Sequence, residues 1–331
     1  MKIRREKWTL WIMLAVILLA ACSGDDTQSD TYVGDDTQEI RFSADVRQVK
    51  SGTRITTIDN EAGLQEQDQD IRIDAYVNGT NTSVISDARL LYADASWKFW
   101  GSGAETHYYW PIEGSYIRST EVTSLDFVGY CPYETGYISG TNYVSSEVQI
   151  SCDMRSYMTH TAQNGLTEFM CGLLQDKKYD DQVDAGGRLQ IELKHPFTRI
   201  RFQLSASHPD ITIHSVTLGG LKAKGTCSFN GTTSTWSDRS EDAVFVADVD
   251  QTLNTNASVQ QIGTDYILIP QTFGGSITIV ASWKEWGEDK SHTVSTTIPS
   301  ATWDPGHSYT YTFTITETDL IVNSEKYTEQ W

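Results

Sequence analysis

The side chains most able to do chemistry in this sequence of 331 residues are seven histidines, five cysteines and 44 carboxylates. A metal site would show histidines spaced as H-x3-H or H-E-x-x-H, and no two of the seven have that spacing. The acidic stretch 59–70 fails as a calcium loop, because Leu64 stands where that loop needs Gly and Asp70 where it needs Glu. No G-x-S-x-G elbow, P-loop or G-x-G-x-x-G segment is present. A glycosidase site made of two carboxylates stays an open alternative, although any given pair of carboxylates is far more often structural. We therefore expect a protein that is not an enzyme and that holds no metal ion and no cofactor.

Cys22 is the one cysteine whose surroundings predict a covalent modification. Four Lys and Arg residues within the first seven positions precede an apolar run, residues 8–21, which is shorter than the ~20 residues of a membrane-spanning helix. The run ends in Leu19-Ala20-Ala21-Cys22, which resembles a bacterial lipobox. Signal peptidase would cut between Ala21 and Cys22, and the thiol would carry a diacylglyceryl group and further acyl chains such as palmitate. Residues 1–21 are thus predicted to be a lipoprotein signal peptide.

The chain left after this cut is strongly acidic. Residues 1–21 carry four basic side chains and one acidic one, so their removal takes the formal charge from −19 to −22. Such a charge repels nucleic acid, which excludes DNA and RNA as partners. Residues 22–38 are polar without apolar periodicity, which predicts a tether between the lipid and the folded part.

From Glu39 onward the dominant apolar period is two, which indicates half-buried strands. Residues 71–77 alternate in this way and run directly into Asn78-Gly79, a pair that favours a hairpin turn. Asn230-Gly231 is expected to form another such turn. Residues 277–281 and 309–315 repeat the alternation, with threonines filling the second face of the latter.

Two segments carry more specific expectations. Along residues 199–204 three apolar side chains alternate with Arg199, Arg201 and Gln203, which predicts one core face and one solvent face. In residues 166–174 the apolar side chains fall at i, i+3, i+4, i+7 and i+8, which fits a short helix or a strand whose residues all pack.

Chain length and a composition shift predict two domains. At ~150 residues per domain, 331 residues suffice for about two. Composition shifts at Asp184-Ala185-Gly186-Gly187, between two strand-rich halves, so we predict an N-terminal β-sandwich over residues 39–186 and a C-terminal one over 187–331.

The cysteines and tryptophans leave alternatives open. Four cysteines follow Cys22 in the chain: Cys131, Cys152, Cys171 and Cys227. They could form two disulfides in any of three pairings, or they could be four buried free thiols, which is the favoured alternative. Exposed tryptophans could stack on sugars, although most tryptophans of sandwiches fill cores. The pairs that could form a stacking platform are Trp97 with Trp100 and Trp283 with Trp286.

The order of several short segments resembles the fimbrillin family, the FimA/Mfa-like lipoproteins of Bacteroidales type V pili. Together these segments span nearly the whole mature chain, the part that begins at Cys22, and they occur beside a lipobox. They are residues 40–44, Ser51-Gly52-Thr53-Arg54, residues 71–77, the strand around Trp97, Tyr108-Tyr109-Trp110-Pro111, residues 125–132, residues 193–200 and residues 303–311.

The resemblance implies an all-β fold of two transthyretin-like Greek-key β-sandwich domains in tandem. It also implies an assembly route, in which a trypsin-like protease cuts after Arg54, or alternatively after Arg47, and the first strand leaves. A strand from the next subunit, either residues 309–315 or 320–331, would then complete the open sandwich by donor-strand exchange. The acidic residues directly after Cys22 resemble the surface-export signal of Bacteroidetes lipoproteins.

These observations lead to one leading hypothesis and one rival. The leading hypothesis is a structural shaft, tip or accessory subunit of a surface fimbrium that supports adhesion and is held in the cell outer membrane by lipid on Cys22. Its partners would be other fimbrial subunits and a host or bacterial surface ligand. The rival is a surface glycan-binding lipoprotein that uses exposed tryptophans.

Overall fold

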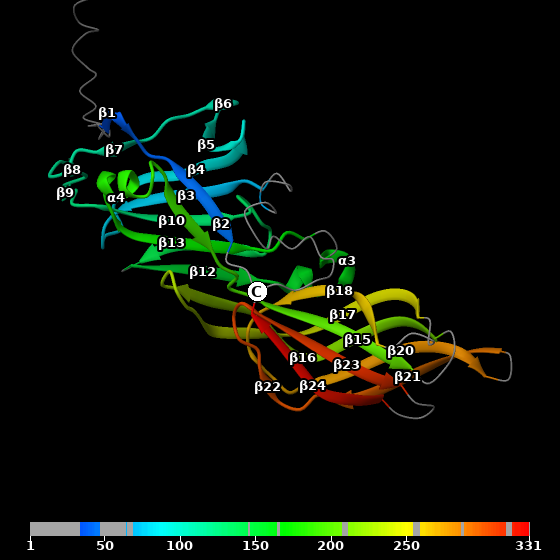
Figure 1. The fold of residues 1–331 in the computed structure, drawn as a ribbon. Helices are drawn as coiled ribbons and strands as arrows, with labels where there is room; N and C mark the ends of the chain where they lie inside the picture. Colours follow the sequence, from blue (N-terminus) through cyan, green and yellow to red (C-terminus); the bar gives the residue numbers. More distant parts are fainter. Residues whose placement is uncertain are drawn as a thin grey trace, which may run out of the picture. The chain divides into compact units, whose positions relative to one another are not determined.

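The computed structural model describes residues 34–46, 64, 69–144, 146–163, 166–206, 211–253, 259–285, 288–315 and 320–330. Residues 33–331 form one compact unit. The described part is almost entirely β-structure (Figure 1), which confirms the all-β class. Its three short helical segments are η1 (Arg155–Tyr157), α3 (His160–Gln163) and α4 (Tyr179–Asp184). None of the described helices is long and apolar enough to cross a membrane.

One six-stranded sheet belongs to the first half of the chain. Its strand order is β13-β10-β3-β4-β5-β6, and neighbouring strands are antiparallel. The strands are β3 (Ile71–Val77), β4 (Ser83–Ala93), β5 (Ser96–Gly101), β6 (Ala104–Glu105), β10 (Leu125–Cys131) and β13 (Met170–Lys177). All seven residues of β10 are buried, as expected for a central strand with both faces covered.

Three two-stranded ladders accompany this sheet, and a fourth lies further along the chain. The first two contain the start of the described chain, because β1 (Gly34–Glu39) pairs with β7 (Tyr109–Pro111) and β2 (Phe42–Val46) pairs with β14 (Leu189–Leu193). The others pair β8 (Tyr116–Ile117) with β9 (Thr120–Glu121) and β19 (Thr272–Phe273) with β22 (Ala301–Thr302).

Two further sheets contain most of the later strands. One has the order β11-β12-β16-β20-β21, with β17 also paired to β16, and the other has the order β18-β15-β23-β24. The strands of the first are β11 (Ile138–Val144), β12 (Glu147–Asp153), β16 (Ile211–Phe229), β17 (Ser234–Leu253), β20 (Ser276–Glu285) and β21 (Glu288–Thr297). The strands of the second are β15 (Thr198–Ala206), β18 (Gln260–Leu268), β23 (His307–Ile315) and β24 (Leu320–Gln330).

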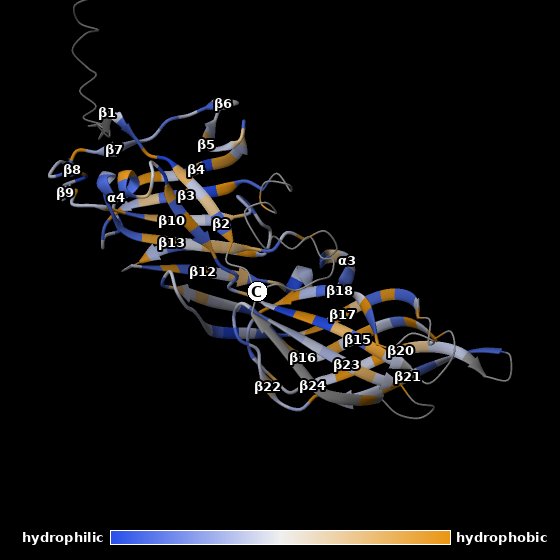
Figure 2. Cartoon of the chain, in the orientation of Figure 1, coloured by the Kyte–Doolittle hydropathy of each residue, from blue (hydrophilic) through white to orange (hydrophobic). Residues whose placement is uncertain are grey.

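The side chains of these two sheets share one core. Buried residues of β16 and β20 belong to the same hydrophobic cluster as those of β15 and β23, which is the arrangement of a β-sandwich. A second cluster joins β2, β3, β5, β10 and β14. Figure 2 shows the alternation of hydrophobic and hydrophilic bands along the strands that supply these cores.

Both Asn-Gly pairs lie in hairpin turns, which confirms that prediction. Residues 78–82 connect β3 to β4, and residues 230–233 connect β16 to β17. Gly79 and Gly231 have φ values of 68° and 87°, a region that suits glycine. The Asn230 side-chain oxygen accepts hydrogen bonds from the backbone N–H groups of Thr232 and Thr233.

Residues 170–177 are a strand. Of the two alternatives for the apolar stretch 166–174, a short helix or a strand, the structure therefore has the strand. β13 pairs with β10 along its length, and the Cys171 backbone exchanges two hydrogen bonds with the Lys194 backbone on its other edge. Consecutive residues are therefore buried at its start: Met170, Cys171 and Gly172. Helical spacing arises by coincidence where a strand packs on both faces.

The solvent face predicted for residues 199–204 is wrong for the two arginines. Arg199 and Arg201 are buried at 2% and 7% exposure. Asp265 on β18 pairs with the Arg201 guanidinium through two 2.7 Å hydrogen bonds, and the Glu168 carboxylate lies 3.8 Å from Arg199. Glu168 lies in the segment before β13, and Gln163, earlier in the chain, bonds both backbone groups of Ile267 on β18 through its side chain.

Hydrogen bonding crosses the position where the composition shifts. β12 pairs with β16, and β2 at the start of the chain pairs with β14, which lies beyond residue 187. The division into domains at 39–186 and 187–331, and the tandem transthyretin-like Greek-key order, stay predictions.

Candidate functional site

The first strands of the described chain are attached at few points. Among the described strands β2 pairs with β14 alone, in parallel from Phe42↔Leu189 to Val46↔Leu193, and β1 pairs with β7 alone. Strands with a single neighbour can leave a sheet without breaking a ladder on both edges. Departure of residues 34–46 would therefore break two ladders, β1 with β7 and β2 with β14, and would leave the six-stranded sheet intact.

The inward side chains of this segment nevertheless fill part of a core. Four apolar residues at alternate positions are each no more than 2% exposed: Ile40, Phe42, Ala44 and Val46. The Phe42 ring meets those of Phe127 and Phe99 edge-on, with centroids 5.2 Å and 6.0 Å away. At ~1.5–3 kcal/mol for each of the three larger side chains, their burial is worth roughly 5–9 kcal/mol. Removal of the segment would leave an apolar groove of matching shape.

A buried glutamine holds the backbone between β1 and β2. Gln182 on α4 is 3% exposed. Its Oε1 accepts a 2.9 Å hydrogen bond from the Arg41 backbone N–H, and its Nε2 donates a 2.8 Å hydrogen bond to the Glu39 carbonyl. The Trp110 Nε1 also donates to this Oε1, at 3.2 Å. Because both contacts with the segment are to main-chain atoms, Gln182 can bind any extended chain that passes there.

An ionic cluster adds a second attachment beside the glutamine. The Glu39 carboxylate contacts His107 and accepts a 2.8 Å hydrogen bond from Arg41. Burial alone would raise the pKa of Glu39, but the hydrogen bonds from His107 and Arg41 outweigh it and hold this pKa below its ordinary value. The folded structure therefore favours the charged carboxylate at this position.

The opposite end of the chain contributes one interior and one edge strand to its sheet. β23 lies between β15, in parallel, and β24, antiparallel. Its residues Tyr309 to Phe313 are mostly buried, with Tyr309 and Phe313 fully so. Among the described strands β24 has β23 as its one partner. Of the two segments expected to supply a donated strand, residues 320–330 are thus the one at an edge.

Several predicted site residues lie outside the described residues. They are Ala21 and Cys22 of the lipobox, Arg47 and Arg54 of the predicted cleavage segment, and Trp286. Arg47 directly follows the last residue of β2, and both arginines precede β3 in the chain. A cut at either position would separate residues 34–46 from the rest of the polypeptide.

The tryptophans predicted to stack on sugars are placed differently from one another. Trp97 and Trp283 are buried, and the Trp283 ring stacks on His292 with centroids 3.6 Å apart. Trp100 is half-buried. A stacking role needs exposed ring faces, and the burial of Trp97 and Trp283 leaves none, because their positions on β5 and β20 point into the core clusters.

The four described cysteines are free and buried. Burial raises the pKa of each thiol, that of Cys227 to about 12. Thiols with such pKa values stay protonated and unreactive at neutral pH. The described residues also contain no cluster of three or more side chains that could hold a metal ion.

No sequence motif points to Gln182. A glutamine in a polar segment such as Tyr179–Asp184 carries no signal of burial. The only indirect sign was Trp110, an aromatic in the Tyr-Tyr-Trp-Pro segment whose indole N–H needs a partner if buried.

Comparison with known proteins assigns the chain to a family. A family model described as fimbrillin-like matches residues 53–331, so the chain belongs to the fimbrillin-like family, as its motif order predicted. A comparison with curated proteins found no match. The assignment places the chain among fimbrial and adhesion proteins of the cell surface, a structural class and not a class of enzymes.

Solved structures support the fold. A fimbrial protein from Bacteroides vulgatus aligns with a TM-score of 0.62 at 15% identity, over 89% of this chain and 99% of that one. Candidate cell adhesion proteins from Bacteroides ovatus and Bacteroides uniformis align with TM-scores of 0.54 and 0.53, each at 15% identity. They cover 91% and 90% of this chain, and 98% and 99% of their own.

Proposed function

We propose that this protein is a structural subunit of a fimbrium that assembles by strand exchange at the groove now filled by residues 40–46. In this proposal the chain is exported as a lipoprotein acylated on Cys22 and displayed on the outer membrane. A protease with trypsin-like specificity cuts after Arg54, or after Arg47, and the first strands leave. The observation that carries the proposal is that residues 40–46 bury apolar side chains, while β1 and β2 each pair with one neighbour.

The incoming strand in the proposal is β24 of a second copy or of another subunit. β24 can be released from one edge of its sheet, whereas release of β23 would expose Tyr309 and Phe313 and break two ladders. In the groove, Gln182 and the free edge of β14 would supply main-chain hydrogen bonds that do not depend on the sequence of the incoming strand. Pockets for alternate side chains would select among strands.

Limited trypsin digestion of the unlipidated chain, residues 22–331 with Cys22→Ser, tests the cleavage step. We expect release of the segment that ends at Arg54 or Arg47 and a ladder of oligomers on non-denaturing gels. The Arg47→Ala/Arg54→Ala double variant should give neither. Arg118→Ala, in the exposed turn between β8 and β9, is the matched control and should behave as the unaltered chain. A ladder that persists in the double variant, or its absence from the cleaved parent, would contradict the proposal.

Deletion of residues 320–331 tests the donated strand. The truncated chain should still release its first segment but should not form the ladder, and circular dichroism should show retained β-structure. Ladder formation by the truncated chain would show that residues 309–315, or another segment, are exchanged instead.

A further inference from the structure

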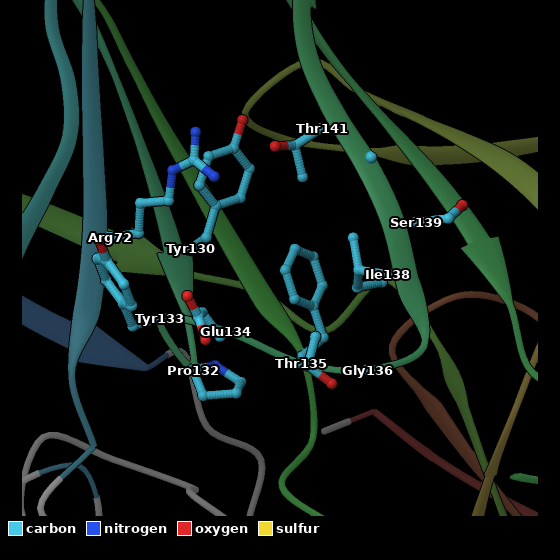
Figure 3. Close-up of a pocket in the computed structure, with 12 residues that line it drawn as sticks. Arg72, Tyr130, Pro132, Tyr133, Glu134, Thr135, Gly136, Ile138, Ser139 and Thr141 are labelled. Atoms are coloured by element: carbon cyan, nitrogen blue, oxygen red, sulfur yellow. The ribbon is translucent and has the colours of Figure 1, made fainter.

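A hollow of about 690 Å³ lies where β10 ends and β11 begins. Its walls come from Arg72 on β3, the segment Tyr130–Gly136 and the first half of β11 (Figure 3). None of its lining residues belongs to the segment 40–46, and none is among the three residues that hydrogen-bond to the Gln182 side chain. The volume falls within the about 300–1,000 Å³ that ligand pockets occupy.

Aromatic rings form the floor and one wall of this hollow. Tyr130 and Phe169 are buried beneath it, with ring centroids 6.0 Å apart and ring planes inclined at 29°. Tyr133 is half-buried at the rim, and its hydroxyl donates a hydrogen bond to the Asp87 carbonyl, which fixes the ring. Figure 3 shows Tyr130 and Tyr133 on one side of the hollow and Ile138 on the other.

The opposite wall offers main-chain hydrogen-bonding groups. Among the described strands β11 has one partner, β12, and its residues 138–141 line the hollow. The ladder is irregular between Ile138 and Gly140, and bulges of this kind often occur next to binding sites. A side chain at Gly140 would meet no atom within 4 Å. Gly140 is exposed and lines the hollow, so no side chain covers its backbone there.

The charges around the hollow do not favour an anion. The Arg72 guanidinium lies 5.5 Å from the centre of the Tyr130 ring, but it is paired with Asp74 at 2.8 Å and with Asp87 at 3.4 Å. Glu134 is exposed at the rim. Once Arg72 is neutralised, the remaining carboxylates make the surroundings negative, as does the whole chain.

We propose that this hollow binds a neutral saccharide. The apolar face of a sugar ring would lie on Tyr133, and its hydroxyl groups would bond to the Glu134 carboxylate, the Thr135 and Thr141 hydroxyls and the exposed edge of β11 near Gly140. An uncharged, hydroxyl-rich ligand with one apolar face matches a site that combines aromatic rings, polar groups and a negative field. The site is separate from the groove of strand exchange, so it would act whether or not the protein polymerises.

Two substitutions test this site without disturbing the core. Tyr133→Ala removes the stacking ring, and Gly140→Val adds a bulky group to a residue that lines the hollow, at a position where a Cβ meets no neighbouring atom. Tyr116→Ala is the matched control, because Tyr116 is 68% exposed and lies outside the hollow. Thermal unfolding should be equal for all three variants and the parent.

The unlipidated chain would be applied to an array of neutral, sialylated and sulfated saccharides, and the hits titrated by calorimetry. We expect neutral saccharides to bind, Tyr133→Ala and Gly140→Val to weaken binding by about tenfold or more, and Tyr116→Ala to leave it unchanged. The proposal is overturned if no neutral saccharide binds, if the hits are confined to charged saccharides, or if binding survives in both hollow variants.

Discussion

Replacement of Gln182 by leucine should loosen the first strands selectively. The change keeps the side-chain size close to that of glutamine but removes the acceptor for Arg41 and Trp110 and the donor to Glu39. Each buried polar group left unpaired costs ~1–3 kcal/mol. Since water can reach Arg41, each of the three groups that lose their partner should cost near the lower end of this range. We therefore expect a total cost of roughly 2–4 kcal/mol.

Hydrogen exchange provides the assay. The Leu189 backbone N–H donates to the Arg41 carbonyl and therefore reports when residues 41–46 detach from β14. A cost of 2–4 kcal/mol corresponds to faster exchange at Leu189 by about 30-fold to several hundred-fold, at tenfold per ~1.4 kcal/mol. Amides of β16 and β20, in the other core cluster, should be unaffected.

Gln149→Leu is the control, because Gln149 lies on β12 with its side chain exposed. Unchanged exchange at Leu189 in Gln182→Leu, with the fold retained, would refute the assignment of Gln182 as the residue that holds the first strands. Equal acceleration at all amides would instead mean that the substitution destabilises the whole unit, and would refute the selectivity.

Three further predictions concern stability. Phe42→Ala should lower the free energy of unfolding by about 3–5 kcal/mol in urea titrations, because a fully buried ring leaves a cavity; a loss below ~1 kcal/mol would mean that the groove collapses around the smaller side chain. Acidification should weaken the attachment of β1: the pKa of Glu39 is lowered in the folded chain from an ordinary value of 4.5, so its contribution is complete above that pH and is lost as the pH falls through the lower, folded value. The protection factor at Leu189, which corrects the observed exchange rate for the intrinsic pH dependence of amide exchange, should fall down this range, and a pH-independent protection factor would contradict the role of the Glu39 contact with His107. Asp265→Asn should cost about 3–5 kcal/mol of unfolding free energy, because it removes the carboxylate that pairs with the buried guanidinium of Arg201; a neutral effect would show that water reaches this pair.

The local pattern of apolar residues was sufficient to predict most strands, but not which of their faces are buried. Residues 71–77, 277–281 and 309–315 are strands with the predicted apolar side chains buried, since alternation acts within a few residues. Residues 199–204 alternate just as clearly, yet both arginines are buried. Their burial depends on Asp265 and Glu168, which come from distant parts of the chain and supply the opposite charges.

The candidate site around residues 34–46 depended even more on contacts between residues that are far apart in the sequence. The order of motifs along the chain was enough to predict the first strand and the arginines that follow it. Which residues hold that strand did not follow from any motif, since Gln182 and Arg41 are 141 positions apart and meet only through folding.

By itself, the amino-acid sequence determined the strand alternation, the two Asn-Gly turns, the strongly acidic charge and the membership of the fimbrillin-like family. These properties are local or compositional, and they are set by side-chain type and spacing. The tertiary structure alone decided that residues 170–177 extend as a strand, that Trp97 and Trp283 lie in the core, and that one glutamine holds the first strands. Each of these depends on which strands become neighbours, and that is fixed by the packing of the whole chain, not by any segment of it.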